Sequence, residues 1–431
     1  MMLDTPVQRG IAVVALLGTL AAAWTLTAPL RSEPVVQEEA QDSPGAQHEA
    51  QAEALDAPVA QEEAPEEAPD APVWPEDRTW DGETHVLTPS GTAGGTCTPE
   101  DPCLRIEDAL RIAEHGDIVE LEGGLYQREL LDGPHHLDAD GDGVLIRPAD
   151  NAEVTIDGLE IRVPRLTIQD LMVSSATMIS PGGDGTRLHR LMIDGATYIA
   201  SVQDVDIIDS TMRPPPDEDG LQIKPLNVGD ELPRNIRVVG NTIGPGMLSA
   251  GNEAHVDAVQ ILGGSGLIVA GNHLLEADSA TMHVSASMGS VDDVLIADNL
   301  IEQCYPMRTG CGAYYALQVR GEPTAVTNVR VHRNSIAGAA FFDVLDGFEA
   351  TGNAITVPIG CVTGMIGNVL HADSWACDHA VNTLVPDPAL AENGTLATPD
   401  GVTSAGVSRP RPSHVLLPSY PSDGSSSSPR R

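Results

Sequence analysis

The sequence is poor in positive charge, and in lysine above all. It holds 23 basic residues against 63 acidic ones, and Lys224 is the single lysine among them. The formal net charge of −40 lacks the basic surface that nucleic-acid binding requires, so nucleic acid is not expected as a partner. Aromatic residues make up only 3% of the chain, which argues against an extended platform of stacked rings.

C-x-x-C spacing, the usual mark of a structural zinc site, is also missing. The six cysteines instead fall into three close pairs along the chain, which are Cys97 and Cys103, Cys304 and Cys311, and Cys361 and Cys377. An even number of locally paired cysteines favours three loop-closing disulfides, and disulfides persist in oxidising compartments. This interpretation of the cysteines fits the export that the N-terminal segment indicates.

Export is also indicated by the N-terminus. Residues 11–30 form one apolar stretch of twenty residues between Arg9 and Arg31. Such a stretch is long enough to span a bilayer, and it equally suits an export signal. We therefore expect residues 1–31 to be either a cleaved signal peptide or a membrane anchor. In both cases the rest of the chain is extracytoplasmic, either secreted or held at the membrane by this segment.

Two further segments lack the composition of a folded domain. Between Glu33 and Asp77 there are fourteen acidic residues and no basic one, and Ala, Pro and Gln fill most of the remainder. Such a segment cannot bury enough apolar surface to fold, so residues 32–78 are predicted to be a disordered linker or stalk. Residues 391–431 are rich in Ser and Pro, and are predicted to be a disordered tail.

The remaining region, residues 79–390, repeats itself irregularly. Short β-branched runs recur with an asparagine behind them, as in IRVVGNTI and LIVAGNHL, and the five asparagines are Asn241, Asn272, Asn299, Asn334 and Asn353. A second strand accompanies each, for example DGLQIK at 219–224 and DAVQIL at 257–262. Periods of 20–40 residues with a recurrent turn are typical of a β-solenoid, in which stacked asparagines form an amide ladder. A β-sandwich is the alternative, but the hairpin turns that it needs are scarce.

The start of this region carries a resemblance. Residues 103–116 have one amphipathic helical period, followed by strands. The matching segments are Ala109-Leu110, Gly116-Asp117-Ile118-Val119 and Gly124-Leu125-Tyr126. This order of helix, strand and Gly-x-Tyr resembles right-handed parallel β-helix proteins of the pectin-lyase-like class. The resemblance implies an all-β, single-stranded right-handed parallel β-helix with a short N-terminal capping helix. It is specific for fold and not for function, because enzymes, adhesins and inert solenoids share that fold.

Strand alternation then predicts which side chains share a face. The expected inward pairs are Leu221 and Ile223, Val259 and Ile261, Met282 and Val284, Leu317 and Val319, and Phe342 and Val344. The residues between them face outward in one polar column, namely Gln222, Gln260, His283, Gln318 and Asp343. Lys224 and Arg320 are expected beside this column, with Tyr314 and Phe341 flanking it. The column is either a solvated face whose amides satisfy one another or a sugar-binding groove.

Two aspartates occupy equivalent positions on successive coils. Asp219 and Asp257 each stand three residues before the column glutamine, so their carboxyl groups are expected roughly 5 Å apart. Paired carboxylates suit Ca²⁺, which prefers oxygen ligands. Alternatively, each aspartate caps the bend before its strand by accepting backbone N–H groups. Both alternatives remain open from the sequence.

The predicted function is therefore carbohydrate-directed. By resemblance to polysaccharide lyases of this fold, Lys224 or His283 would take a proton from a uronate, and Arg320 or a bound Ca²⁺ would neutralise its carboxylate. A glycosidase would instead use paired carboxylates, but the combined motif set of polygalacturonases is absent. The alternative is a non-catalytic cell-surface β-helix, an adhesin, glycan-binding protein or spacer. The expected partners are a polysaccharide or cell-surface glycan, and the membrane through the N-terminal segment.

Overall fold

The structure is a computed structural model that describes residues 80–133, 136–137, 141–252, 254–303, 314–321, 324–371, 382–385, 389–390 and 396–397. The apolar segment 11–30 and the linker 32–78 lie outside these residues, as does most of the segment 391–431. Among the described residues, no helix is long and apolar enough to cross a membrane.

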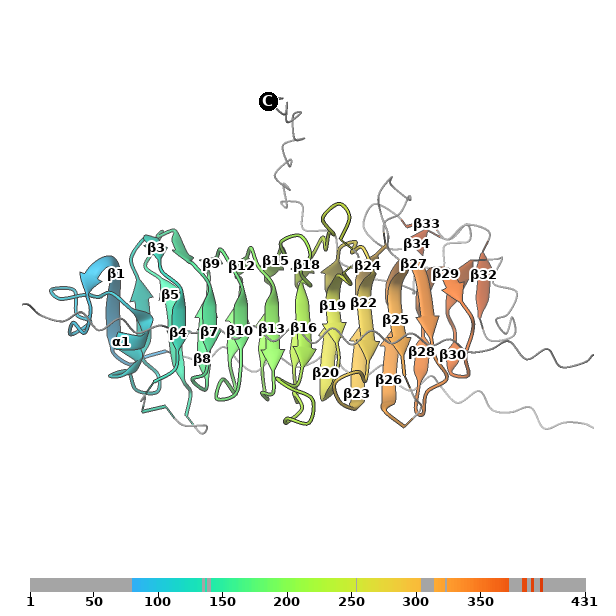
Figure 1. Cartoon of the computed structure of the whole chain (residues 1–431), viewed down its shortest axis with the longest axis horizontal. Coiled ribbons are helices and arrows are strands. Elements are labelled where there is room, and N and C mark those ends of the chain that lie inside the picture. The colour runs from blue at the N-terminus through green and yellow to red at the C-terminus, as the bar shows by residue number, and fades with distance from the viewer. Residues whose placement is uncertain are drawn as a thin grey trace, which may run out of the picture. The chain divides into compact units, whose positions relative to one another are not determined.

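The described chain winds into coils whose short strands stack in parallel along the molecule (Figure 1). They form one sheet of twelve strands, called sheet 1, and one of twenty strands, whose two parts are called sheet 2 and sheet 3. Sheet 1 contains β1 (Thr84–Thr92), β2 (Ile118–Leu121), β5 (Val144–Pro148), β8 (Leu166–Gln169), β11 (Arg187–His189), β14 (Asp206–Ile208), β17 (Arg237–Val239), β20 (Gly264–Ala270), β23 (Val291–Ala297), β26 (Val326–His332), β28 (Glu349–Thr351) and β30 (Met365–Ile366).

Sheet 2 contains β3 (Gly124–Tyr126), β6 (Val154–Ile156), β9 (Met172–Val173), β12 (Met192–Ile193), β15 (Thr211–Met212), β18 (Thr242–Ile243), β21 (His273–Leu274), β24 (Leu300–Glu302), β27 (Ser335–Phe342), β29 (Ala354–Ile359), β31 (Val369–His371) and β32 (Thr383–Val385). Sheet 3 contains β4 (Glu129–Leu131), β7 (Leu159–Ile161), β10 (Thr177–Ile179), β13 (Thr197–Ala200), β16 (Leu221–Lys224), β19 (Asp257–Ile261), β22 (Ala280–Ser285) and β25 (Tyr315–Arg320). The later halves of β27 and β29 continue sheet 3, so these two strands join sheets 2 and 3.

Within each sheet, every strand pairs in parallel with the equivalent strand of the next coil, as β16 does with β19 and β19 with β22. Strand-crossover-strand connections of this kind are right-handed. The fold is therefore a right-handed parallel β-helix, as the sequence predicted. A separate antiparallel pair, β33 (Ala389–Leu390) and β34 (Leu396–Ala397), follows the last coils, and β34 falls within the predicted tail.

The core fills the interior of the coils. Eight of the ten predicted inward residues, those on β16, β19, β22 and β25, are fully buried. Each coil buries its apolar residues against the coils before and after it, which is why the alternation along these short strands is so regular. At about 0.8 kcal/mol for each buried CH₂ group, this continuous apolar column is the main source of stability.

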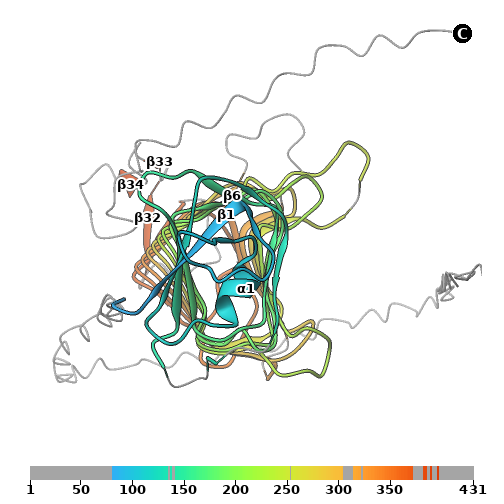
Figure 2. The ribbon, with the colours of Figure 1, turned by 90° about the vertical axis from the view of Figure 1, so that its left-hand side faces the viewer.

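The N-terminal end of the stack is closed by α1 (Ile106–Leu110), shorter than the predicted helix over 103–116 (Figure 2). Its apolar side, formed by Ile106, Ala109 and Leu110, is buried. In a β-solenoid the first coil has no preceding neighbour to cover its interior, so a terminal cap is required. The helix thus confirms the predicted capping element.

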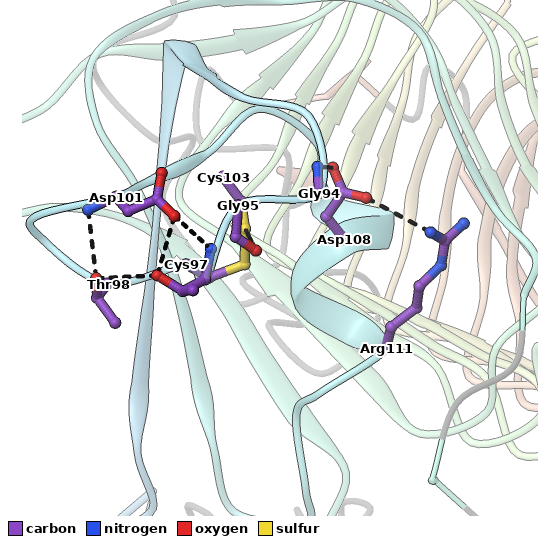
Figure 3. The surroundings of a disulfide bond; sticks show 9 residues. Gly94, Gly95, Cys97, Thr98, Asp101, Cys103, Asp108 and Arg111 are labelled. Carbon is purple, nitrogen blue, oxygen red and sulfur yellow. Dashed lines mark hydrogen bonds and ion pairs between the residues drawn. A yellow bond between two sulfur atoms is a disulfide. The ribbon is translucent and has the colours of Figure 1, made fainter.

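One of the three predicted disulfides is described in full. Cys97 and Cys103 are bonded to one another and close a short loop beside α1 (Figure 3). Asp108 of α1 accepts the backbone N–H of Gly94 at 3.1 Å, which ties this loop to the cap. Cys361 is also disulfide-bonded. Its predicted partner Cys377 lies outside the described residues, as do Cys304 and Cys311.

The predicted asparagine ladder runs along the turn between sheets 1 and 2. It comprises Asn241, Asn272, Asn299, Asn334, Asn353, Asn368 and Asn382, two members more than the sequence repeats suggested. In each of the first six, the side-chain amide donates to the Oδ1 atom of the next at 2.9–3.1 Å. The backbone N–H of each donates to the same oxygen. The residue before each asparagine has a left-handed backbone where the structure gives it, for example Gly240 at φ 70° and Asp298 at φ 56°.

The predicted register fails at the last aligned coil. Phe342 pairs with Val319 and Phe341 with Gln318, so Phe341 faces outward where Asp343 was predicted. Val344 is 69% exposed and is not a core residue. The reason is that β27 runs from sheet 2 into sheet 3 without a turn and contains an irregularity between Ile336 and Ala339. The third-sheet strand therefore begins two residues earlier than the alternation suggested.

Candidate functional site

A polar column runs along the outer face of sheet 3. The register pairs Gln222 with Gln260, Gln260 with His283, and His283 with Gln318 on four successive coils. We call these four residues the sheet 3 column. The sequence predicted all four as outward-facing neighbours, and the strand pairing confirms that they are neighbours. Gln222 Nε2 donates to Gln260 Oε1 at 3.0 Å, as expected if the amides satisfy one another, and Gln318 is only 6% exposed.

Aromatic side chains bound the sheet 3 column at both ends. Tyr198 pairs with Gln222 on the preceding coil, and Phe341 pairs with Gln318 on the following one. Phe341 also packs against Tyr315, with ring centroids 5.8 Å apart. Five steps of about 4.8 Å separate the coil of Tyr198 from that of Phe341, roughly 24 Å along the stack. Tyr314, predicted as a flanking residue, is 74% exposed at the start of β25.

The two aspartates cap the coils. Asp219 Oδ1 accepts the backbone N–H of Asp257 at 2.6 Å, and Asp257 Oδ1 accepts that of Ala280 at 2.9 Å. Their second oxygens hold the glutamines of their own strands, because Gln222 Nε2 donates to Asp219 Oδ2 and Gln260 Nε2 to Asp257 Oδ2. Of the two alternatives from the sequence, these contacts correspond to capping. Calcium binding by this pair stays a prediction.

Burial and charge perturb Asp219. Its side chain is nearly buried, and this burial raises the pKa of its carboxyl group against the lowering effect of the hydrogen bonds from Asp257 and Gln222. The neighbouring carboxylate of Asp257 raises the pKa further. Asp257 itself has no exposed surface. The carboxylates are therefore built into the coil edge rather than standing in solvent.

Two histidines meet at Asp257. His255 Nδ1 lies 3.1 Å from Asp257 Oδ2, and the rings of His255 and His283 are 5.5 Å apart in an edge-to-face arrangement. The hydrogen bond to Asp257 raises the pKa of His255, whereas burial lowers the pKa of His283. His283 Nδ1 lies 2.9 Å from Gln318 Oε1. Because an amide oxygen only accepts, Nδ1 carries the proton and Nε2 keeps a lone pair.

The two predicted cations lie on the same face but apart. Lys224 Nζ stands 5.4 Å from the ring centroid of Tyr198, directed to the preceding coil. Arg320 pairs with Ser285 on β22, and its charge contributes to lowering the pKa of His283. Among the described residues, neither cation has an ion-pair partner. Lys224 is two coils from His283, so these two predicted catalytic residues do not meet.

Asp343 lies at the end of the third-sheet strand, outside the column. Its Oδ2 atom accepts the backbone N–H of Gly321 at 3.0 Å, which ties together the turns of two neighbouring coils. The predicted role of Asp343 as a member of the column is therefore wrong, for the register reason given above.

Sequence reasoning missed two residues of this face. His255 belongs to the loop before β19, whose path alternation cannot give. The signal was the His-x-Asp spacing, which places both side chains on one side of an extended segment. Tyr198 precedes the aligned repeats, and its signal was the alternation in TYIA at 197–200.

A hollow lies on the outer face of sheet 1. It has a volume of about 580 Å³ and is walled by charged side chains, including Arg237, Asp206 and Arg330. Arg237 binds Asp206 through two hydrogen bonds of 2.6 Å, and Arg330 pairs with Asp293 at 2.7 Å. These charges are therefore matched within the wall, whereas Lys224 and Arg320 on the sheet 3 face have no ion-pair partner among the described residues.

No protein-family model and no curated protein matches the sequence. Solved structures share a distant likeness. The chain aligns with the crystal structure of pectate lyase Pel9A at a TM-score of 0.37 and 11% identity, over 68% of this chain and 75% of that one. It aligns with a rhamnogalacturonan lyase at a TM-score of 0.38 and 11% identity, over 74% and 92%. It aligns with the crystal structure of DFA-IIIase from Arthrobacter chlorophenolicus A6 without its lid at a TM-score of 0.32 and 15% identity, over 64% of this chain and 69% of that one.

The class of the protein rests on its own strand pairing. Three stacks of parallel strands with a ladder along one turn define a parallel β-helix, and its capped first coil agrees with the pectin-lyase-like resemblance of residues 103–126. The particular activity has to be argued from the sheet 3 face.

Proposed function

We propose that the chain is a carbohydrate-directed β-helix protein that binds a polysaccharide along the outer face of sheet 3. The observation that carries this proposal is the sheet 3 column, four polar side chains on successive coils with Tyr198 at one end and Phe341 at the other. Amides and an imidazole offer both donors and acceptors to sugar hydroxyls, and aromatic faces suit the apolar side of a sugar ring. A regular row of such groups fits a repeating polymer.

Lys224 and Arg320 favour an acidic polysaccharide, because both cations lie on this face without an ion-pair partner among the described residues. The surrounding protein is strongly acidic, so local cations are needed for an anionic chain to approach. The bonded pair Cys97 and Cys103 supports an exported location, since disulfides persist outside reducing compartments. Attachment to the membrane through residues 1–31 belongs to the same proposal.

Binding to a panel of neutral and uronate polysaccharides, measured by isothermal titration calorimetry on the full chain, tests the proposal. Gln260→Ala and Tyr198→Ala should each weaken binding about 5- to 30-fold, corresponding to the roughly 1–2 kcal/mol of a lost hydrogen bond or ring contact. Gln169→Ala is the matched control, because Gln169 ends β8 on sheet 1. Equal losses in all three variants, or no binding to any polymer by the wild type, would refute the proposal.

A second candidate is β-elimination on a uronate, with His283 as the base. It is favoured by the hydrogen bond from His283 to Gln318, which leaves Nε2 with a lone pair. Elimination should give the ultraviolet absorbance of an unsaturated uronate, lost in His283→Ala and retained in His273→Ala. Loss in Lys224→Ala with unchanged substrate binding would instead make Lys224 the base. Binding without turnover supports the non-catalytic alternative.

A further inference from the structure

Three side chains at the middle of the sheet 3 face have the composition of a metal site. His255, Asp257 and His283 each offer one ligand atom, and these atoms all lie within 4.8 Å of one another. Two imidazole nitrogens and one carboxylate oxygen are ligands that zinc and similar divalent ions accept, whereas calcium prefers oxygen alone. The donor set therefore differs from the Asp219 and Asp257 pair that the sequence suggested for calcium.

The spacing suits a small ion. His255 Nδ1 and Asp257 Oδ2 are 3.1 Å apart. Two atoms bound about 2.0–2.1 Å from zinc and separated by this distance subtend an angle of about 100° at the ion, close to tetrahedral. In the metal-free chain a proton lies between these two atoms, and the ion would take its place. His283 offers a third ligand atom from the next coil, within 4.8 Å of the other two, and it would have to lie closer than this limit for all three to bind one ion.

Outer contacts hold two of the ligands in a binding orientation. Gln318 accepts from His283 Nδ1, which leaves the Nε2 lone pair for a metal. Gln260 donates to Asp257 Oδ2, and the backbone N–H of Ala280 fixes the other carboxylate oxygen. Metal-binding histidines and carboxylates are usually held by such partners, which set the tautomer and the ring orientation.

The position also has access to solvent. The side chain of His255 is 53% exposed, while that of Asp257 is fully buried. An ion here would be bound on its inner side by Asp257 and would be open to solvent on the outer side of sheet 3. Three protein ligands leave at least one coordination position for water or for a sugar oxygen.

We propose that His255, Asp257 and His283 bind one divalent ion of the zinc type. Its open coordination position faces the outer side of sheet 3, where the polysaccharide is proposed to bind. The binding of the ion stands on these three residues alone, and its link to sugar rests on the function proposed above. The ion adds positive charge to an acidic protein at the place where an anionic polymer would bind. It uses the lone pair of His283, so a bound ion excludes His283 as the base of an elimination.

The test is metal binding by the untagged full-length chain, after chelation and dialysis, with Zn²⁺ and Ca²⁺ titrated separately by calorimetry. We expect one Zn²⁺ per chain, bound far more tightly than Ca²⁺. His255→Gln and His283→Gln should each weaken Zn²⁺ binding more than about 100-fold. Gln318→Leu should weaken it about 10- to 100-fold, as outer partners do. His273→Gln is the matched control, because His273 forms a histidine-carboxylate pair with Glu302 on sheet 2.

Circular dichroism of every variant checks that the fold is retained. Wild-type affinity for Zn²⁺ in the His255→Gln and His283→Gln variants would overturn the inference, as would an equal loss in His273→Gln or a preference for Ca²⁺. Polysaccharide titrations with and without Zn²⁺ separate the two proposals. Zinc binding without any polysaccharide binding would support the metal site and refute the proposed polysaccharide binding on sheet 3. Polysaccharide binding without zinc binding would do the reverse.

Discussion

Replacement of Asn299 by alanine should destabilise the β-helix far more than its single side chain suggests. Asn299 stands in the middle of the asparagine ladder and has no exposed surface. Its Oδ1 atom accepts from the backbone N–H and the side-chain amide of Asn272, both at 2.9 Å. Its own amide donates to Val269 O at 2.8 Å and to Asn334 Oδ1 at 2.9 Å. Four buried hydrogen bonds therefore depend on it.

The magnitude follows from the groups that are left behind. Asn299→Ala strands the backbone N–H of Asn272, one amide hydrogen of that side chain and the carbonyl of Val269. Each buried polar group without a partner costs about 1–3 kcal/mol, so the three together predict a loss of roughly 3–9 kcal/mol in the free energy of unfolding. Part of that cost is recovered where water enters the cavity left by the side chain.

Urea unfolding followed by far-ultraviolet circular dichroism measures this loss. Asn227→Ala is the control, because Asn227 is exposed and its side chain bonds only within its own loop. The control should change the unfolding free energy by less than about 0.5 kcal/mol. A loss below about 1 kcal/mol for Asn299→Ala would refute the ladder as a source of stability. A solenoid can unfold in parts, so the whole transition should be compared and not only its midpoint.

Three further predictions concern buried polar groups elsewhere. Burial, only partly offset by Arg105, raises the pKa of Glu129 to about 7. The folded state therefore holds this proton more tightly than the unfolded state, and the free energy of unfolding should fall by about 3 kcal/mol at most as pH rises from 4.5 to 7. Urea unfolding at several pH values should show a weaker dependence of stability on pH in Glu129→Gln. Tyr126→Phe removes a hydroxyl that bonds the carbonyls of Leu87 and Glu122, and should cost about 1–2 kcal/mol by the same assay. Asp206→Ala removes the buried carboxylate that Arg187 and Arg237 both bind on sheet 1 and should cost about 2–4 kcal/mol; an unchanged melting temperature would contradict this.

The fold could be predicted from the sequence because each coil repeats the same short pattern of residues. A strand of alternating residues, a residue with left-handed backbone and a buried asparagine recur at every turn from Asn241 to Asn353. Loop lengths vary freely without disturbing this pattern, since a solenoid places its insertions outside the stack. The exception is β27, where the turn between two sheets is missing and the count of alternating positions slips by two.

The candidate site was less predictable because half of its geometry comes from loops. Strand alternation placed Gln222, Gln260, His283 and Gln318 correctly, since their direction is fixed by the pleat. His255 reaches the same face from a loop, and the direction of Lys224 is set by the ring of Tyr198 rather than by the backbone. Long, flexible side chains and loop residues take their positions from tertiary contacts that a single sequence does not reveal.

The capping aspartates hold both the coil stack and the side chains on the outer face of sheet 3. Asp257 uses one oxygen to hold the backbone N–H of the next coil and the other to hold Gln260 and His255. Because the first contact belongs to the coil stack, the carboxylate cannot move without opening the step between two coils. Gln260 and His255 are therefore oriented by the same carboxylate that stabilises the solenoid. For the binding proposed above, such an arrangement holds the contacting atoms on a rigid element, which lowers the entropic cost of binding.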